Sequence, residues 1–239
     1  MTKIMARTIE ALRKDVLAAN LEIYTRGLAQ FTFGNVSGVD RERGVVVIKP
    51  SGVPYAQLTA KMLVVCDLDG TVTAGSLRPS SDLPTHLVLY RAFPEVNGIV
   101  HTHSPHATAW AQAGREIPCV GTTHADHFYG SIPVTDAMTA REIARDYEAN
   151  TGRVIVRRFR GVDPLQVPAV LVRSHASFCW GASVGAAVET AAVLETVARM
   201  ASETLAINPK TKPIAPPLLN RHFLRKHGAA AYYGQPDAK

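Results

Sequence analysis

The chain has 239 residues, a formal net charge of +6 and a pI near 9.4. Its 46% hydrophobic and 19% charged content predicts a folded chain and excludes an extensively disordered one. No apolar run approaches the roughly 20 residues that cross a bilayer, and the N-terminus lacks the apolar stretch of a secretion signal. The three cysteines lie far apart without C-x-x-C spacing, so neither a disulfide framework nor a cysteine metal site is indicated. We therefore expect a cytoplasmic protein without a membrane partner.

The basic residues are spread along the chain, with short clusters only at 157–158 and 221–227. No helix-turn-helix, zinc-finger or RNA-binding pattern accompanies them. A solvated basic surface explains the positive charge, and we expect no nucleic-acid partner. A small anionic substrate would need only a few of these charges.

The first half of the chain predicts a helix followed by strands. Apolar residues near helical spacing indicate an amphipathic helix over 7–26. Apolar runs at 45–48 and 62–66 predict strands, and Asp69-Gly70 predicts a hairpin between the second run and 71–73. A helix is predicted from Ser81-Asp82 to Phe93, where Pro94 ends it, and a strand is predicted over 96–103.

The second half begins with Ser104-Pro105, an N-cap and first-turn proline that predict a helix through Ala113. Strands are predicted at 154–156 and 169–172, a long helix over 184–205, and a basic helix over 218–227 that ends at Gly228. No linker or repeat interrupts this order. The irregular succession of strands and helices predicts helices packed on a mixed sheet, in a single domain over residues 1–239.

Three histidines follow apolar runs. His101 and His103 are two residues apart at the end of a predicted strand and would project from the same face. His175 follows another apolar run, 169–172. A catalytic zinc ion commonly takes three protein ligands and keeps one position open, so the three histidines indicate a metal site. A polar strand end followed by a helix cap is the plainer alternative, and we expect His106 to lie at the surface or behind the ligands.

Three loops expose hydroxyl and backbone N–H groups: 34–37, 49–52 and 79–82. Such loops can hold a phosphate, although Ser80, Ser81 and Asp82 could equally serve as helix caps. None of the loops matches a P-loop or G-x-G-x-x-G pattern, so no nucleotide cofactor is indicated.

Several motifs in this order resemble the class II aldolase family, and within it the L-ribulose-5-phosphate 4-epimerases. They are Gly34-Asn35-Val-Ser37, Ile48-Lys-Pro-Ser-Gly52, Pro79-Ser-Ser-Asp82, Gly98-Ile-Val-His-Thr-His103, Gly121-Thr-Thr-His-Ala-Asp126, Leu224-Arg-Lys-His-Gly228 and Ala231-Tyr-Tyr-Gly-Gln235. The resemblance covers about residues 20–235. The Thr-His-Ala-Asp stretch and the Tyr-Tyr-Gly-Gln ending are the features more specific to the epimerases. The segment around His175 departs from the apolar and Gly-Pro context that is common in the family.

The resemblance implies an α/β fold with three layers, α/β/α, around a central mixed, mainly antiparallel sheet. It implies a homotetramer with one Zn²⁺ per subunit and active sites between subunits. The implied metal ligands are His101, His103 and His175, with Asp82 as a further ligand or near neighbour. The implied residues that bind the phosphorylated sugar are Gly34, Asn35, Ser51, Gly52, Ser80 and Ser81. Asp126 and Tyr233 would be the acid/base pair, with Tyr233 supplied by the adjacent subunit.

The implied reaction is epimerisation of L-ribulose 5-phosphate to D-xylulose 5-phosphate, which serves arabinose or ascorbate catabolism. Two alternatives remain open. A class II sugar-phosphate aldolase would share the metal site, but aldolases usually carry a glutamate base where this chain has Asp82. A non-catalytic, adducin-like interaction module would not need a complete set of three histidines.

Overall fold

The computed structural model describes residues 8–229 and 231–233. Its centre is a seven-stranded sheet in the order β4-β3-β2-β1-β5-β7-β6. The strands are β1 (Asn35–Asp40), β2 (Val45–Ile48), β3 (Val64–Asp67), β4 (Val72–Ala74), β5 (Gly98–Thr102), β6 (Ala169–Leu171) and β7 (Ser177–Gly181). Every neighbouring pair is antiparallel, and among the described residues the only parallel pairing is the isolated bridge Val134–Leu171.

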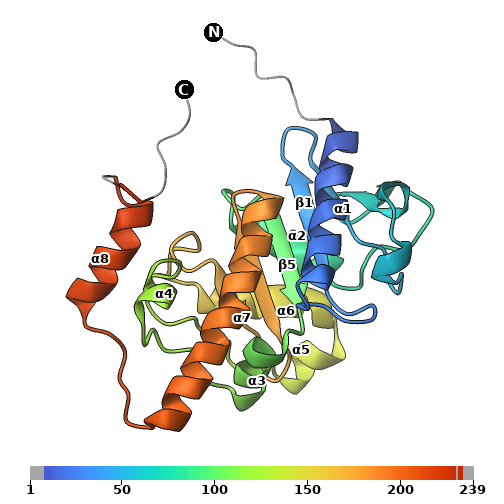
Figure 1. The fold of residues 1–239 in the computed structure, drawn as a ribbon. Helices are drawn as coiled ribbons and strands as arrows, with labels where there is room; N and C mark the ends of the chain where they lie inside the picture. Colours follow the sequence, from blue (N-terminus) through green and yellow to red (C-terminus); the bar gives the residue numbers. More distant parts are fainter. Residues whose placement is uncertain (1–7, 230, 234–239) are drawn as a thin grey trace.

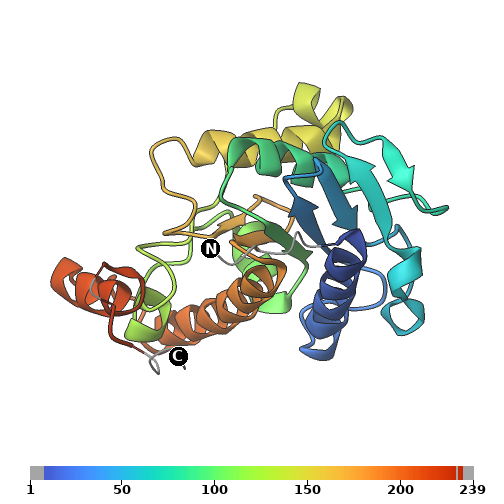
Figure 2. The ribbon, with the colours of Figure 1, turned by 90° about the horizontal axis from the view of Figure 1, so that it is seen from above.

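Helices cover both faces of the sheet and complete the three layers that the sequence led us to expect (Figures 1 and 2). One face carries α1 (Ile9–Thr25), α3 (Pro105–Ala113) and α7 (Val184–Ile207). The other carries α2 (Leu83–Ala92), α5 (Ala140–Ala144) and α6 (Tyr147–Arg158). The short α4 (Thr122–Ala125) and α8 (Pro216–His227) pack together at one end of the molecule. Two 3-10 turns, Tyr55–Gln57 and Ala60–Met62, lie between β2 and β3. No helix within the described residues is long and apolar enough to cross a bilayer.

The central strands are buried along their whole length. Every residue of β1, β2, β5 and β7 is buried, because helices cover both faces of the sheet. At Gly98, a Cβ atom would lie 2.6 Å from both the carbonyl oxygen of Ser183 and the Cα of Val184. The glycine therefore lets the start of α7 approach β5 closely, and β5 carries two of the histidines.

The structure confirms most of the predicted elements and corrects one. The predicted strand at 154–156 is wrong, because these residues belong to α6. Val154, Ile155 and Val156 are β-branched and favour strands locally, but tertiary packing outweighs that preference. Val154 and Ile155 lie on the buried face of α6, and a Cβ at Gly152 would lie 2.7 Å from Val88 Cβ, which shows how closely α6 meets α2. Strands β1 and β7 were not anticipated from the sequence.

Candidate functional site

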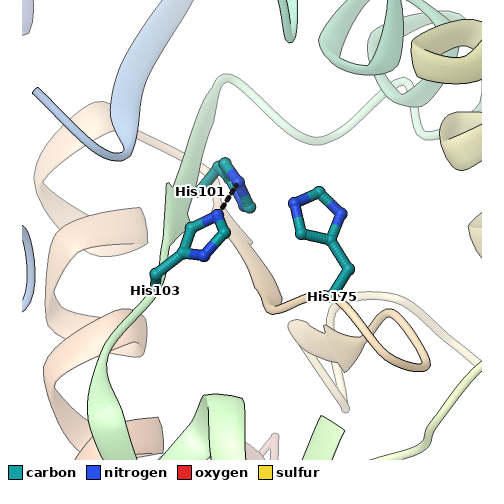
Figure 3. Close-up of side chains that lie close together, drawn as sticks. All are labelled: His101, His103 and His175. Atoms are coloured by element: carbon teal, nitrogen blue, oxygen red, sulfur yellow. Dashed lines mark hydrogen bonds between the residues drawn. The ribbon is translucent and has the colours of Figure 1, made fainter. Parts of the chain in front are cut away.

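One strand end and one turn bring the three histidines together. His101 is the fourth residue of β5, His103 follows directly after this strand, and His175 lies in the turn between β6 and β7 rather than at a strand end. The ring centroids are 4.9 Å apart for His101–His103, 5.0 Å for His101–His175 and 5.1 Å for His103–His175. One nitrogen from each ring lies within 4.8 Å of the others, and the rings face a common space (Figure 3).

The turn that carries His175 is held against α3. Ser174 has a left-handed backbone with φ of 60°, an unusual conformation for a residue other than glycine. Its N–H donates to the carbonyl oxygen of Ala111 in α3 at 2.9 Å, and the His175 N–H donates to the carbonyl of Val172 at 3.0 Å. These two bonds hold the turn in the conformation that points His175 at the other two rings.

The protonation of His101 follows from its hydrogen bond. Nδ1 lies 2.9 Å from the carbonyl oxygen of Ser177, which can only accept, so Nδ1 carries a hydrogen and Nε2 is the nitrogen that holds the lone pair in the neutral ring. Phe178 stacks on the same ring at 4.3 Å between centroids. The orientation of the ring is therefore fixed by its edge and by one face.

The histidine cluster fits a divalent cation. The Nε2 atoms of His101 and His103 face each other at 3.1 Å, and Nδ1 of His175 is buried without a hydrogen-bond partner. Burial, followed by the neighbouring His101, lowers the pKa of His103 below its ordinary value and lowers that of His175 to about 4. Both rings are therefore neutral near pH 7, which is the state that binds metal.

Asp82 adds a carboxylate beside the cluster. It occupies the N-cap position of α2, but its side chain does not cap the helix. Its Oδ2 instead accepts a hydrogen bond of 2.7 Å from Asn35 Nδ2 and lies 4.0 Å from His101 Nε2. Burial acts to raise the pKa of Asp82, but His101, His86 and the Asn35 hydrogen bond outweigh it and lower the pKa. The position and ionisation of Asp82 suit a fourth ligand or a close neighbour of a metal ion.

These groups line one cavity of about 410 Å³, a volume suited to a small sugar phosphate. All the residues predicted as metal ligands or substrate-binding groups line it: Gly34, Asn35, Ser51, Gly52, Ser80, Ser81, Asp82, His101, His103 and His175. Gly34 is needed for two reasons, since its φ is 75° and a Cβ would lie 2.7 Å from the carbonyl oxygen of His101. His106 does not line the cavity. It lies at the start of α3, where its backbone N–H donates to the Glu195 carboxylate of α7 at 2.9 Å.

The two serine-containing loops are joined to each other beside the histidines. The Ser51 N–H donates to the backbone carbonyl oxygen of Arg78 at 3.0 Å, and the Ser80 N–H donates to the backbone carbonyl oxygen of Lys49 at 2.9 Å. These two N–H groups are therefore used to hold the loops together. Within the described residues, the hydroxyls of Ser51 and Ser81 and the N–H of Gly52 have no partner and remain available to an anion.

Three further ionisable residues line the cavity, and none of them was assigned a role from the sequence: Lys49, Tyr147 and Glu148. Lys49 is 1% exposed, its Nζ lies 4.9 Å from the centroid of the Tyr55 ring, and burial lowers its pKa. The sequence could have indicated the burial of Lys49, because this residue directly follows the apolar run 45–48, every residue of which is buried in β2. Tyr147 and Glu148 also line the cavity, but they begin α6, which was not predicted.

Asp126 and Tyr233 lie elsewhere, in the corner formed by α4 and α8, and neither lines the cavity. Asp126 accepts hydrogen bonds from Arg225 at 2.7 and 3.0 Å and lies 3.0 Å from His222 Nδ1. Burial acts to raise the pKa of Asp126, but the hydrogen bonds of Arg225 and His222 lower it overall. The Tyr233 ring lies 4.8 Å from the Arg225 guanidinium carbon, so the two candidate acid/base residues share Arg225. The last residues of the predicted motif, 234–235, lie outside the described residues.

Comparisons with known proteins agree with this architecture. Residues 14–202 match the family described as class II aldolase and adducin N-terminal domain. The L-ribulose-5-phosphate 4-epimerases UlaF of Salmonella paratyphi B and Salmonella typhi are each 52% identical over 95% of this chain and 100% of the relative.

Solved structures share the fold at lower identity. An L-fuculose 1-phosphate aldolase superposes with a TM-score of 0.77 at 20% identity, covering 91% of this chain and 97% of that structure. YgbL of Klebsiella pneumoniae, described as a putative aldolase/epimerase/decarboxylase, gives 0.69 at 25% identity over 88% and 96%. From its family match and its identity to the UlaF proteins, the chain belongs to the class II aldolase and adducin N-terminal domain family.

Proposed function

We propose that the chain is a zinc-dependent L-ribulose-5-phosphate 4-epimerase, folded as a single domain over residues 1–239 and active in the cytoplasm in pentose catabolism. The observation that carries the proposal is the three-histidine cavity with its serine loops, in a chain 52% identical to relatives named as this epimerase.

The reaction requires a carbon–carbon bond to break. The C4–H bond of a 2-ketose is not adjacent to the carbonyl, so simple deprotonation cannot invert C4. Removal of the C4 hydroxyl proton instead allows C3–C4 to break, leaving an enediolate of three carbons and glycolaldehyde phosphate. Rotation of this aldehyde, re-formation of C3–C4 on its other face and return of the proton give the opposite configuration at C4.

The histidine cluster would hold the metal. His101, His103 and His175 would be ligands, with Asp82 as a further ligand or close neighbour. A bound zinc ion supplies a Lewis acid for the charge of the enediolate. The neutral rings leave their lone pairs available near pH 7, and Asn35 holds the Asp82 carboxylate toward the cluster.

The serine loops would hold the phosphate. The free hydroxyls of Ser51 and Ser81 and the N–H of Gly52 can donate to phosphate oxygens from one side of the cavity. Gly34, Asn35 and Ser80 would complete the substrate contacts. This grip keeps the aldehyde fragment in place after cleavage, so that re-addition competes with escape.

Asp126 and Tyr233 would carry the protons. A rotated aldehyde presents its oxygen in two directions, so two groups are needed to exchange its proton. Because neither residue lines the cavity of its own chain, we infer that a neighbouring subunit in a homotetramer supplies them. Because Arg225 contacts both, we further infer that one neighbour supplies the pair. Phe33 lines the cavity and is 53% exposed, and the 73% exposed Phe31 lies 5.6 Å from it between ring centroids, so a neighbour would have an apolar surface to pack against.

A class II aldolase is the second candidate, since solved aldolases share the fold. The aspartate at position 82, where aldolases usually carry glutamate, favours the epimerase. The intact histidine cluster argues against a non-catalytic, adducin-like module.

Product analysis tests the proposal. The protein is supplied with zinc, its bound metal is measured, and it is incubated with L-ribulose 5-phosphate while the products are followed by carbon NMR. The epimerase should give D-xylulose 5-phosphate with little free glycolaldehyde phosphate. Accumulation of fragments would identify an aldolase, and an unchanged substrate with no bound metal would support the interaction module.

A further inference from the structure

A buried histidine lies one helical turn beyond Asp82 on α2. His86 is 0% exposed, and its Nε2 has no hydrogen-bond partner within the described residues. Its Nδ1 lies 2.7 Å from Ser37 Oγ, and the same oxygen lies 2.8 Å from the Tyr90 hydroxyl. A buried polar atom without a partner is costly, so the free nitrogen needs a physical explanation.

The hydrogen bonds determine which ring nitrogen carries the hydrogen. Within the described residues, Ser37 is the only side chain at hydrogen-bond distance from the Tyr90 hydroxyl. The hydroxyl protons of Tyr90 and Ser37 both find an acceptor only if Tyr90 donates to Ser37 and Ser37 donates to His86 Nδ1. His86 then carries its hydrogen on Nε2. Burial lowers the pKa of His86 to about 3, so the ring remains a neutral N–H donor near pH 7.

The Asp82 carboxylate lies one helical turn before His86, whose backbone N–H donates to the Asp82 backbone carbonyl at 3.1 Å. Residues four apart on a helix lie on the same face, so Asp82 and His86 are neighbours on α2. The two side chains also act on each other electrostatically: His86 helps to lower the pKa of Asp82, and Asp82 partly offsets the lowering of the His86 pKa by burial. The Asp82 carboxylate accepts a hydrogen bond from Asn35 and lies beside His101. Apart from the backbone bond, the side chains of Asp82 and His86 make no direct bond to each other within the described residues.

His86 also reaches the metal site by packing. Its ring meets Phe178 edge-on at 5.9 Å between centroids, and Phe178 stacks on His101. The imidazole is therefore locked between the Ser37–Tyr90 chain and the residue that supports the first histidine ligand. A ring fixed in this way is a rigid donor.

We propose that His86 is a positioning residue for the metal site: its Nε2–H, directed by Tyr90 and Ser37, holds the Asp82 carboxylate through one buried bridging water. This inference rests on the proposed metal site. Groups behind the ligands of a metal commonly change its affinity by about 10–100-fold, which sets the expected size of the effect.

Zinc affinity, measured by competition with a chromophoric chelator, provides the test. His86→Leu removes the donor and should weaken zinc binding by about tenfold or more. His86→Gln keeps an amide N–H near the position of Nε2 and should recover part of the loss. Leu89→Ala, a buried α2 variant outside the chain of hydrogen bonds, should lower the melting temperature without changing zinc affinity.

A double variant identifies the partner. If His86 acts through Asp82, adding His86→Leu to Asp82→Asn should cause little further loss of zinc affinity. Losses that multiply, or a His86→Leu protein that binds zinc as tightly as the wild type, would overturn the inference. A wild-type protein that binds no zinc would instead count against the proposed function.

The tautomer of His86 can be read without any change to the site. Nitrogen shifts of ¹⁵N-histidine-labelled wild-type protein should show His86 protonated at Nε2, with assignment by the resonance missing from His86→Gln. Ser37→Ala removes the donor to Nδ1 and should shift this resonance. A wild-type ring protonated at Nδ1 would contradict the proposed direction of the chain, even if His86→Leu failed to fold.

Discussion

At the scale of single residues, the proposed metal site depends on histidine rings whose orientation is fixed by hydrogen bonds and packing on the side away from the cavity. The Ser177 carbonyl sets the tautomer of His101, and burial keeps His103 and His175 unprotonated. The sequence was sufficient to predict that His101 and His103 lie together, because strand geometry places them on one face. It was not sufficient for Tyr147 and Glu148, since only the packing of α6 on α2 brings them to the cavity.

Replacement of either strand histidine should remove the metal and the activity. We expect His101→Asn and His103→Asn to lose bound zinc and epimerase activity while keeping the wild-type circular dichroism spectrum. His106→Asn is the matched control, because this histidine follows the same strand but lies outside the cavity. Full activity in a zinc-free His101→Asn protein would show that the cluster is not the catalytic metal site.

Removal of one serine hydroxyl should weaken phosphate binding. A hydrogen bond to a charged group contributes about 1.5–3 kcal/mol, so Ser51→Ala should raise KM for L-ribulose 5-phosphate by about tenfold or more. The same variant should leave turnover of unphosphorylated L-ribulose almost unchanged. Equal use of both sugars by the wild-type protein would rule out a phosphate role for this loop.

At the scale of elements, the packing of α2 on α6 decides what local preference cannot. Val154 to Val156 read as a strand in isolation, but the amphipathic pattern of the whole segment buries Thr151, Gly152, Val154 and Ile155 on one side. Longer and cleaner patterns, such as α7 and the apolar run of β2, were predictable because local preference and packing agree there.

A methyl group at the α2–α6 contact should destabilise the protein. In Gly152→Ala the new Cβ would lie 2.7 Å from Val88 Cβ, and overpacking of this kind costs about 1–3 kcal/mol. Gly185→Ala in α7 is the matched control, since nothing lies within 4 Å of its Cβ position. Urea unfolding should show a loss for the first variant and none for the second. Equal stability would mean that the two helices are not packed this closely.

At the scale of the whole molecule, buried histidines make the fold sensitive to acid. Burial lowers the pKa of His86 to about 3 and of His124 to about 4, against 6.5 for an ordinary histidine. Between these values the unfolded chain binds more protons than the folded chain, so the free energy of unfolding falls as the pH drops below 6.5. The two histidines should together remove about 4 kcal/mol between pH 7 and pH 5.

Urea titrations of the metal-free protein at several pH values measure this loss. Above about pH 7 these two histidines should add almost nothing to the dependence of the free energy of unfolding on pH, because they are neutral in both the folded and the unfolded chain. His124→Gln removes one such group and should reduce the slope between pH 6 and pH 5 by about 1 kcal/mol per pH unit. Stability that is constant or rises as the pH falls through this range would contradict the buried, neutral state of these rings.

The claim that one active site is built from two chains is tested most directly by co-expressing pairs of inactive variants and purifying the mixed oligomers. In the proposed site the metal ligands would belong to one chain, and a neighbouring chain would supply Asp126 and Tyr233, which both contact Arg225 of their own chain. His101→Asn chains mixed with Tyr233→Phe chains should therefore form some complete sites and regain epimerase activity. Asp126→Asn mixed with Tyr233→Phe should stay inactive, because each neighbour supplies one damaged pair. Mixed oligomers of the first combination that are no more active than their parents would contradict a site shared between chains. Recovery in the second combination would contradict delivery of both residues by one neighbour.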